Sequence, residues 1–380
     1  MITLLKNANL LVNRNGEWNT ECHDIFIENG KVLGFECDSV PNACVNLGEQ
    51  LLLPLFFNIH CHLGETLYKI EGDNWTISKY LKYTSNIVNN MTEEENNLMW
   101  NYSAQKTIKE MIKNGIGVFC AARSAELAKE YNICTMSGYP LMISKKLQRY
   151  YLEGFSGFSR YVNNNYSKGC SVGIFLHSLY KADEKLLRLA EKCFSYKADF
   201  ITVHISEDLE TRNLEIEKFQ QEPVLVLDKY KLLTDKTILV HGGFLSKKEL
   251  ELVRKRNVMI AVCPISNHFL NTSCVDVYTL EKMGIRWCLA TDGLATGRTF
   301  SIIEQAIELK SQFPKISNIK VLQSVSTIPA QVFNRRIYTG MIEKGVKAAF
   351  ILVNNNSNNI ENVLEGLFTG NVSWEVMNFE

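Results

Sequence analysis

The chain has 380 residues, of which 46% are hydrophobic and 22% are charged. These fractions are typical of a globular protein and exclude disordered, collagen-like and coiled-coil chains. The 41 basic and 41 acidic side chains cancel, so the sequence lacks the excess positive charge of proteins that bind nucleic acids or anionic membranes. We therefore expect a small-molecule partner, no nucleic acid and no membrane, and we leave a homodimer open.

The start of the chain and its cysteines indicate the cellular compartment of the protein. No apolar run approaches the roughly 18 residues that span a bilayer. The segment MITLLKNANLLVNRNG contains Lys6 and several asparagines, where a signal peptide needs an apolar core. The 11 cysteines include no CxxC pair, and in a chain of this size they are expected to be reduced thiols. We predict a cytoplasmic protein.

Both ends of the chain have strand character. The runs ANLLVN, DIFIEN and KVLGFEC are separated by Asn-Gly and Gly residues that favour turns. This pattern is typical of short strands joined by turns. The runs KAAFILV and VSWEVMNF repeat this pattern near the C-terminus. We expect residues 1–53 and 331–380 to form one composite β-sandwich domain.

Between these ends, short apolar runs alternate with longer amphipathic stretches rich in Lys and Glu. This alternation is typical of repeated βα units around a parallel sheet. About eight runs have strand character, which is the number that closes a (β/α)8 TIM-like barrel. They are LFFNIHCH, GIGVFCA, ICTMSG, SVGIFLH, DFITVH, TILVHG, VMIAVCP and RWCLATD. We expect residues 54–330 to form this barrel.

Histidines end several of the predicted strands. His60 and His62 are two residues apart, so a strand directs both side chains to one face. His204 and Asp292 end later strands. Because the C-terminal ends of barrel strands meet at one mouth, we expect these four side chains to lie together. Three imidazoles and one carboxylate are a reasonable ligand set for Zn²⁺ or a similar divalent ion.

Six motifs occur along the chain in the order PLFFNIHCHLGE, GIFLHSLY, VHISE, LVHGGFLS, VCPISNHFL and LATDGLATG. In this order the sequence resembles the amidohydrolase superfamily, in the branch of cytosine, guanine and S-adenosylhomocysteine deaminases and triazine chlorohydrolases. The resemblance implies a proton-shuttling acid at Glu207, a histidine that orients water or polarises the substrate at His241, and a substrate contact at His177. It also implies a catalytic and ligand role for Asp292.

The chain departs from the usual motifs at Leu55, where a glycine is common, and at Phe244, where a second histidine is common. No lysine ends the fourth predicted strand, where binuclear members of the superfamily carry a carbamylated one. We therefore expect one divalent ion, with Zn²⁺ as the first choice and Fe²⁺ and Mn²⁺ left open.

The resemblance implies a metal-dependent aminohydrolase, or deaminase. Such an enzyme attacks an amino-bearing carbon of a heterocyclic, purine- or nucleoside-like substrate with metal-activated water and releases ammonia. The alternatives are a hydrolase of the same fold that acts on a cyclic amide or an aryl halide, and a non-catalytic relative.

Three further residues follow the first two predicted strands of the barrel and are candidates for its mouth. They are Glu65, Trp75 and Arg123. We assign a substrate-stacking role to Trp75 and a carboxylate- or phosphate-binding role to Arg123. A packed tryptophan and an exposed loop charge are the alternatives.

Overall fold

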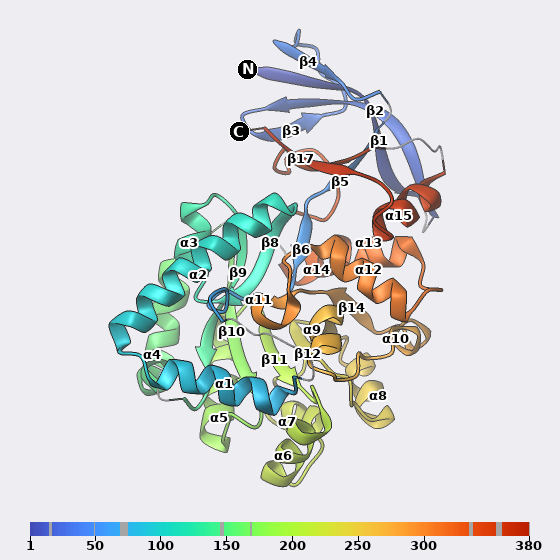
Figure 1. The fold of residues 1–380 in the computed structure, drawn as a ribbon. Coiled ribbons are helices and arrows are strands. Elements are labelled where there is room, and N and C mark those ends of the chain that lie inside the picture. The colour runs from blue at the N-terminus through green and yellow to red at the C-terminus, as the bar shows by residue number, and fades with distance from the viewer. Residues whose placement is uncertain are drawn as a thin grey trace. The chain divides into compact units, whose positions relative to one another are not determined.

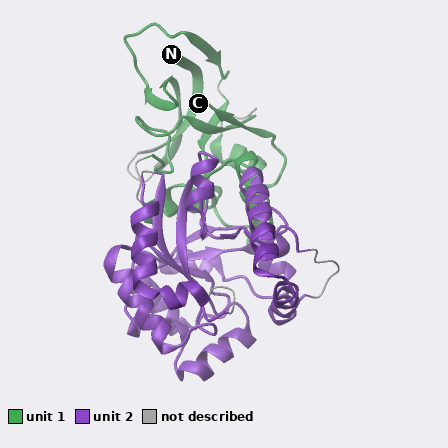
Figure 2. Ribbon diagram, turned by 90° about the vertical axis from the view of Figure 1, so that its left-hand side faces the viewer, with its two compact units in different colours: residues 1–57, 111–118, 301–380 green, residues 58–110, 119–300 purple. Residues whose placement is uncertain are grey.

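The computed structural model describes residues 1–14, 17–48, 50–68, 75–144, 148–167, 169–333, 337–354 and 359–379. The chain divides into two compact units (Figure 2). One unit comprises residues 1–57, 111–118 and 301–380, and the other comprises residues 58–110 and 119–300. The domain limits expected from the sequence, 1–53 with 331–380 and 54–330, stay a prediction.

Strands from both ends of the chain form a seven-stranded mixed sheet in the first unit (Figure 1). Its order is β17-β16-β5-β1-β2-β3, and β4 pairs with β1. Neighbours are antiparallel except that β4 and β5 run parallel to β1. The strands are β1 (Ile2–Arg14), β2 (Glu17–Glu28), β3 (Lys31–Gly34), β4 (Ala43–Asn46), β5 (Leu51–Pro54), β16 (Ala349–Val353) and β17 (Trp374–Asn378).

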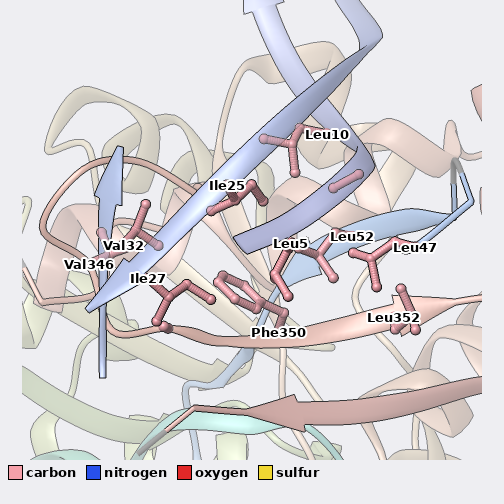
Figure 3. Packing of buried hydrophobic residues seen from close by; sticks show 12 residues of the cluster. Leu5, Leu10, Ile25, Ile27, Val32, Leu47, Leu52, Val346, Phe350 and Leu352 are labelled. Carbon is pink, nitrogen blue, oxygen red and sulfur yellow. The ribbon is translucent and has the colours of Figure 1, made fainter. Parts of the chain in front are cut away.

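A hydrophobic cluster holds this sheet together (Figure 3). Leu5, Ile25 and Phe350 are at most 1% exposed, although they come from the two ends of the chain. Burying side chains of this size contributes roughly 1.5–3 kcal/mol each to stability. The N-terminal strands therefore depend on the C-terminal segment for their core.

Eight strands form the second sheet, in the order β14-β13-β12-β11-β10-β9-β8-β6. The pairings from β9 to β14 are parallel, and neighbours in the chain are neighbours in the sheet. This confirms the expected TIM-like barrel with a separate sheet from both chain ends. The strands are β6 (Phe56–Asn58), β8 (Ile116–Ala122), β9 (Cys134–Leu141), β10 (Cys170–Ser178), β11 (Ile201–Ile205), β12 (Thr237–His241), β13 (Met259–Val262) and β14 (Arg286–Leu289).

Two very short strands join the first and last strands of this sheet. β7 (Cys61–His62) pairs in parallel with β15 (Asp292–Gly293). Just before them, Asn58 Nδ2 donates to Thr291 Oγ1 at 2.7 Å, and the Thr291 amide donates to Asn58 Oδ1 at 3.1 Å. The barrel is therefore closed by polar bonds immediately beside the predicted metal ligands.

Helices follow most of the barrel strands (Figure 1). The sequence caps several of them; for example, Ser246 and Glu249 form a capping box that begins α8. No helix in the described ranges is long and apolar enough to cross a membrane. The helices are α1 (Ile77–Asn89), α2 (Glu93–Lys113), α3 (Ala125–Glu130), α4 (Gln148–Asn165), α5 (Glu184–Lys197), α6 (Leu209–Phe219), α7 (Pro223–Lys229), α8 (Lys247–Lys255), α9 (Pro264–Phe269), α10 (Val277–Met283), α11 (Leu294–Gly297), α12 (Ile302–Gln312), α13 (Asn318–Ser324), α14 (Thr327–Phe333) and α15 (Ile360–Phe368).

Replacing Asn58 tests the polar closure of the barrel. Asn58→Ala leaves the buried Thr291 amide and hydroxyl without these partners, which costs about 2–4 kcal/mol. We expect the midpoint of thermal unfolding to fall by roughly 2–4 °C for each kcal/mol lost. The control, Asn163→Ala on an exposed position of α4, should leave the midpoint nearly unchanged. An equal midpoint in both variants would contradict a stabilising role for the Asn58 bonds.

Candidate metal centre and active site

The four predicted ligands converge in the second unit. The ligand atoms of His60, His62, His204 and Asp292 all lie within 4.8 Å of one another. The Nε2 atom of His204 is 3.1 Å from that of His60 and 3.2 Å from that of His62. Asp292 Oδ1 is 3.4 Å from His60 Nε2 and 3.2 Å from His62 Nε2. His60 and His62 follow the first strand of the barrel sheet, His204 lies in the fifth, and Asp292 follows the last.

The spacing of these atoms fits a shared divalent cation. The four separations just given are 3.1–3.4 Å, which a divalent ion with bonds of about 2.0–2.1 Å to nitrogen and oxygen can span. Three imidazole nitrogens that face one another are poor hydrogen-bond partners, because neutral nitrogens without a proton can only accept. A cation held between the nitrogens would accept their lone pairs. Imidazole and carboxylate ligands suit zinc, iron or manganese.

Surrounding polar groups orient the candidate ligands. His204 Nδ1 donates to the carbonyl oxygen of His177 at 2.6 Å, which leaves the Nε2 lone pair for a metal. Asp292 Oδ2 accepts from Ser266 Oγ at 2.6 Å and from Thr296 Oγ1 at 2.9 Å. The other carboxylate oxygen of Asp292 is thereby turned toward the histidines.

Burial and charge favour the protonation states that metal ligands need at three of the four residues. At His62, the carboxylates of Glu65 and Asp292 outweigh burial and raise the pKa to about 9. Burial lowers the pKa of His60 to about 4 and holds the pKa of His204 well below its ordinary value. Burial alone would raise the pKa of Asp292, but hydrogen bonds with His60 and His62 hold it well below the usual range. Two neutral imidazoles and an ionised carboxylate are ready to bind a cation without losing protons.

The backbone is strained where the site residues leave their strands. His241 has φ 69° and Asp292 has φ 60°, both in the left-handed region that side chains other than glycine rarely adopt. Such conformations cost on the order of 1–3 kcal/mol and persist where the surrounding structure enforces them, often at functional sites. Here they occur at Asp292, a candidate ligand, and at His241, which faces Glu207.

Glu207 and His241 face each other beside the ligand cluster. Glu207 Oε1 lies 3.5 Å from His241 Nε2, and both side chains are nearly buried. His241 Nδ1 donates to Asn267 Oδ1 at 2.9 Å, so the proton is on Nδ1. Nε2 is buried and has no hydrogen-bond partner among the described residues. Burial raises the pKa of Glu207 above its ordinary value, against the opposing effect of His241.

A network of Arg212, Glu215 and Glu249 holds the loop that carries Glu207. The Ser206 amide donates to Glu215 Oε2 at 3.3 Å, and Arg212 donates to Ser206 Oγ at 3.0 Å. Arg212 also donates to Glu249 at 2.7 Å. Burial raises the pKa of Glu215 to about 8. This network fixes the turn between a candidate ligand and a candidate acid.

A cavity of about 370 Å³ opens onto the cluster. Its wall includes three of the four candidate ligands, together with Glu207 and His177. Burial lowers the pKa of His177 to about 3, so this imidazole is neutral and would contact a ligand by hydrogen bonding. The other residues of the wall are Glu65, Tyr68, Ile77, Tyr80, Leu81, Thr84, Ser85, Val88, Met142, Ile143, Ser144, Tyr180, Lys181 and Leu270.

The remaining sequence candidates lie in different places. Trp75 is 7% exposed and packs in a hydrophobic cluster with Ile77, Tyr80 and Leu270, three residues that line the cavity. Arg123 lines a second cavity of about 200 Å³. The substrate contacts assigned to Trp75, Arg123 and His177 stay predictions.

No pattern in the sequence indicated the residues that support the site. Ser266, Asn267 and Thr296 position the candidate ligands and His241, but serine, asparagine and threonine are common after strands and in short helices. Glu65 was one of several candidates for the mouth. Its carboxylate lies against Gly293, where a Cβ atom would collide with Glu65 Oε2. A glycine directly after Asp292 was the only available signal of this close approach.

Fold and site together define a metal-dependent barrel hydrolase. The chain belongs to the amidohydrolase family, which matches residues 51–373, and this confirms the resemblance seen in the motifs.

Proteins with similar sequences include two named deaminases. The 5-methylthioadenosine/S-adenosylhomocysteine deaminase of Pyrococcus horikoshii is 26% identical over 337 residues, which are 86% of this chain and 76% of that protein. The 5'-deoxyadenosine deaminase of Methanobrevibacter smithii is 26% identical over 360 residues, which are 88% of this chain and 80% of that protein. A zinc-bound adenosine deaminase from Xanthomonas campestris has the same fold, with a TM-score of 0.83 at 17% identity, over 97% of this chain and 90% of that chain.

Metal content provides a direct test of the cluster. We expect about one divalent ion per chain, because four candidate ligands share one position. His60→Ala should lose most of this metal while its circular dichroism spectrum stays that of a folded barrel, since a catalytic metal is not the source of the folding energy. The control is His23→Ala, at a position in β2 that lies in the other unit. Two equivalents of metal, or full metal in His60→Ala, would contradict the proposed ligand set.

Proposed function

We propose that the protein is a metal-dependent deaminase of adenosine-like compounds. The observation that carries this proposal is the placement of Glu207, which faces His241 and lies in one cavity wall with three of the four candidate ligands, His62, His204 and Asp292. This arrangement offers a proton donor, a hydrogen-bonding imidazole and a cation site to one substrate carbon. The names of the similar deaminases support an adenosine-like substrate.

His60, His62, His204 and Asp292 would hold the metal, and we propose zinc as the native ion. A divalent ion there would lower the pKa of a bound water from 15.7 toward about 7 and supply hydroxide at neutral pH. Asp292 Oδ1 lies on the inner side of the cluster and would accept a proton from that water. Its Oδ2 atom accepts from Ser266 and Thr296, and these bonds would keep Oδ1 turned toward the histidines.

Glu207 would act first as an acid and then as a base. Its raised pKa keeps the proton on the carboxyl to a higher pH than usual, which suits a general acid. Protonation of a ring nitrogen makes the adjacent amino-bearing carbon electrophilic. Hydrolysis then replaces the amino group by a carbonyl oxygen and releases ammonia, so that one water is consumed for each ammonia formed.

His241 and His177 would orient the substrate. The hydrogen bond from Nδ1 to Asn267 holds the His241 ring with Nε2 toward Glu207. In this proposal, Nε2 would accept a hydrogen bond from the attacking water and hold that water in line with the ring carbon. His177 is neutral and lies in the same wall, where it would contact a ring nitrogen or a sugar hydroxyl.

A substrate panel tests the reaction class. We expect ammonia release from 5'-deoxyadenosine, 5'-methylthioadenosine or S-adenosylhomocysteine, together with the absorbance change of adenine-to-hypoxanthine conversion. Cyclic amides and aryl halides serve as the comparison, because the alternative hydrolases would use the same cluster. Turnover of a cyclic amide or an aryl halide, with no ammonia released from any adenosine-like compound, would contradict the proposal.

Glu207→Gln separates a proton-transfer role from the other roles of a buried glutamate. The amide fills the same volume, so metal content and substrate affinity should be retained. The turnover number should fall by roughly 10²- to 10⁴-fold, the usual contribution of a general acid or base. Glu210→Gln, on the exposed first turn of α6, is the matched control and should keep normal turnover. Near-normal turnover of Glu207→Gln would refute the assigned role, and loss of metal would make Glu207 a ligand.

A further inference from the structure

The strands that carry His177 and His204 lie side by side, but their pairing is irregular at the end that carries these histidines. β10 and β11 are parallel, and their register shifts between Leu176 and Ser178, so His177 has no paired residue in β11. The last pair of this ladder is Ser178 with His204. A bulge of this kind redirects a side chain and interrupts the ladder. The turns that follow both strands lie beyond the ladder.

The spacing of these two turns matters for the proposed reaction. His177 lies just before the turn after β10, and Glu207 lies in the turn after β11. Both side chains line the cavity of about 370 Å³. The His177 carbonyl also accepts from Nδ1 of His204 at 2.6 Å, so a shift of the first turn would disturb a candidate ligand. The relative position of the turns therefore decides how an acid and a neutral imidazole meet one substrate.

One buried carboxylate contacts the backbone of both turns. The amide of Ser206, the residue just before Glu207, donates to Glu215 Oε2 at 3.3 Å. The backbone amide of Leu179, two residues after His177, hydrogen-bonds to the same carboxylate. Burial raises the pKa of Glu215, and these two amides oppose that effect. The Glu215 carboxylate thus joins the two turns where the ladder has ended.

The helix that carries Glu215 buries this acid and exposes its leucines. Thr211 and Glu215 are buried in α6, whereas Leu209 and Leu214 are 58% and 46% exposed. A helix held only by apolar packing would bury the leucines and expose the acid. Burying a carboxylate is costly unless hydrogen bonds replace the lost water. We therefore explain the burial of Glu215 by the groups that it binds, and not by the space that it fills.

Neighbouring residues of α6 hold the same two turns. Arg212, three residues before Glu215, donates to Ser206 Oγ at 3.0 Å. Lys218, three residues after Glu215, donates to the carbonyl oxygen of Tyr180 at 3.1 Å. Residues three apart are neighbours on a helix surface. One side of α6 therefore contacts the turn after β10 through Lys218 and the turn after β11 through Arg212, and Glu215 between them contacts both.

We propose that Glu215 is a positioning residue, which sets the spacing of His177 and Glu207 across the cavity by binding the backbone of both turns. This inference rests on the proposed deaminase function, because that function assigns both side chains to one substrate. Glu215 is not among the described residues that line the cavity. It would therefore act through the two side chains and not on the substrate.

Hydrogen exchange measured by mass spectrometry tests the contact with both turns. Glu215→Leu removes both acceptor oxygens, so exchange in residues 177–182 and in residues 204–209 should become faster by about tenfold or more, because each segment loses a bond from a buried amide. The matched control is Glu217→Leu, the same change at an exposed position of α6, which should leave both segments unchanged. Faster exchange in only one segment, or in neither, would overturn the proposal.

A double-mutant comparison separates positioning from a general structural role. Glu215→Leu should lower kcat by roughly 10- to 100-fold, because a small displacement of a reacting group is costly. In the Glu207→Gln background, which has already lost the acid, the further loss should be less than about threefold. The same factor in both backgrounds is the result expected of a merely structural residue, and it would refute the assigned role.

The conservative variant Glu215→Gln keeps one acceptor oxygen and the volume of the side chain. Its turnover should lie between that of the unmodified enzyme and that of Glu215→Leu. Turnover no better than that of Glu215→Leu would show that the oxygens are not what matters. If Glu215→Leu does not fold, the comparison with Glu207→Gln is made with Glu215→Gln, and normal turnover of Glu215→Gln would then count against the proposal.

Hydrogen exchange also keeps this test separate from the proposed reaction, because it needs no substrate. If no adenosine-like compound releases ammonia but both segments exchange faster in Glu215→Leu, the deaminase proposal fails and the tie between the two turns stands. If ammonia is released and both segments keep their original exchange in Glu215→Leu, the deaminase stands and the positioning role of Glu215 fails.

Discussion

The structure depends on the short parallel pairing of β7 with β15, because this contact both closes the barrel and forms the site. His62 lies in β7 and Asp292 lies in β15, so closure places an imidazole and a carboxylate side by side in a buried position. Burying polar groups is costly unless they are paired. The Asn58 and Thr291 bonds satisfy the polar groups of the closing strands, and the remaining nitrogens and oxygen converge where a cation would satisfy them.

The supporting hydrogen bonds give each polar side chain one orientation. Carbonyl and amide oxygens take the Nδ1 protons of His204 and His241, and hydroxyl groups take one oxygen of Asp292. Nε2 of His204 and Oδ1 of Asp292 are thereby left as acceptors, whereas burial raises the pKa of the nearby Glu207 carboxyl. In the proposed function, this asymmetry would separate cation binding from proton donation within a few ångströms. Such a site would hold hydroxide and an acid together, because burial raises the pKa of Glu207.

Much of this arrangement could be predicted from strand periodicity. The two-residue spacing of His60 and His62 and the strand-end position of His204 placed them on one face, since parallel strands present their C-terminal ends at one mouth. The supporting residues could not be predicted, because a serine or asparagine in a loop gives no sign of its distant partner. Trp75 shows where prediction from sequence ends. Its position near the mouth does not reveal whether the ring faces the cavity or packs beneath the cavity wall. Loop conformation, which strand patterns do not encode, decides this.

Two absent side chains shape the cavities. Gly64 admits Trp100, and Gly293 admits the carboxylate of Glu65, and both glycines are close in the chain to candidate metal ligands. A methyl group at Gly64 would displace the Trp100 ring, whereas one at Gly293 would also press on the candidate ligand His62, 3.2 Å away. During evolution, the range of accepted molecules could therefore change through a small substitution at Gly64 without rebuilding the reaction centre. Diversification of substrate choice and preservation of chemistry would then proceed on separate positions of the same short segment.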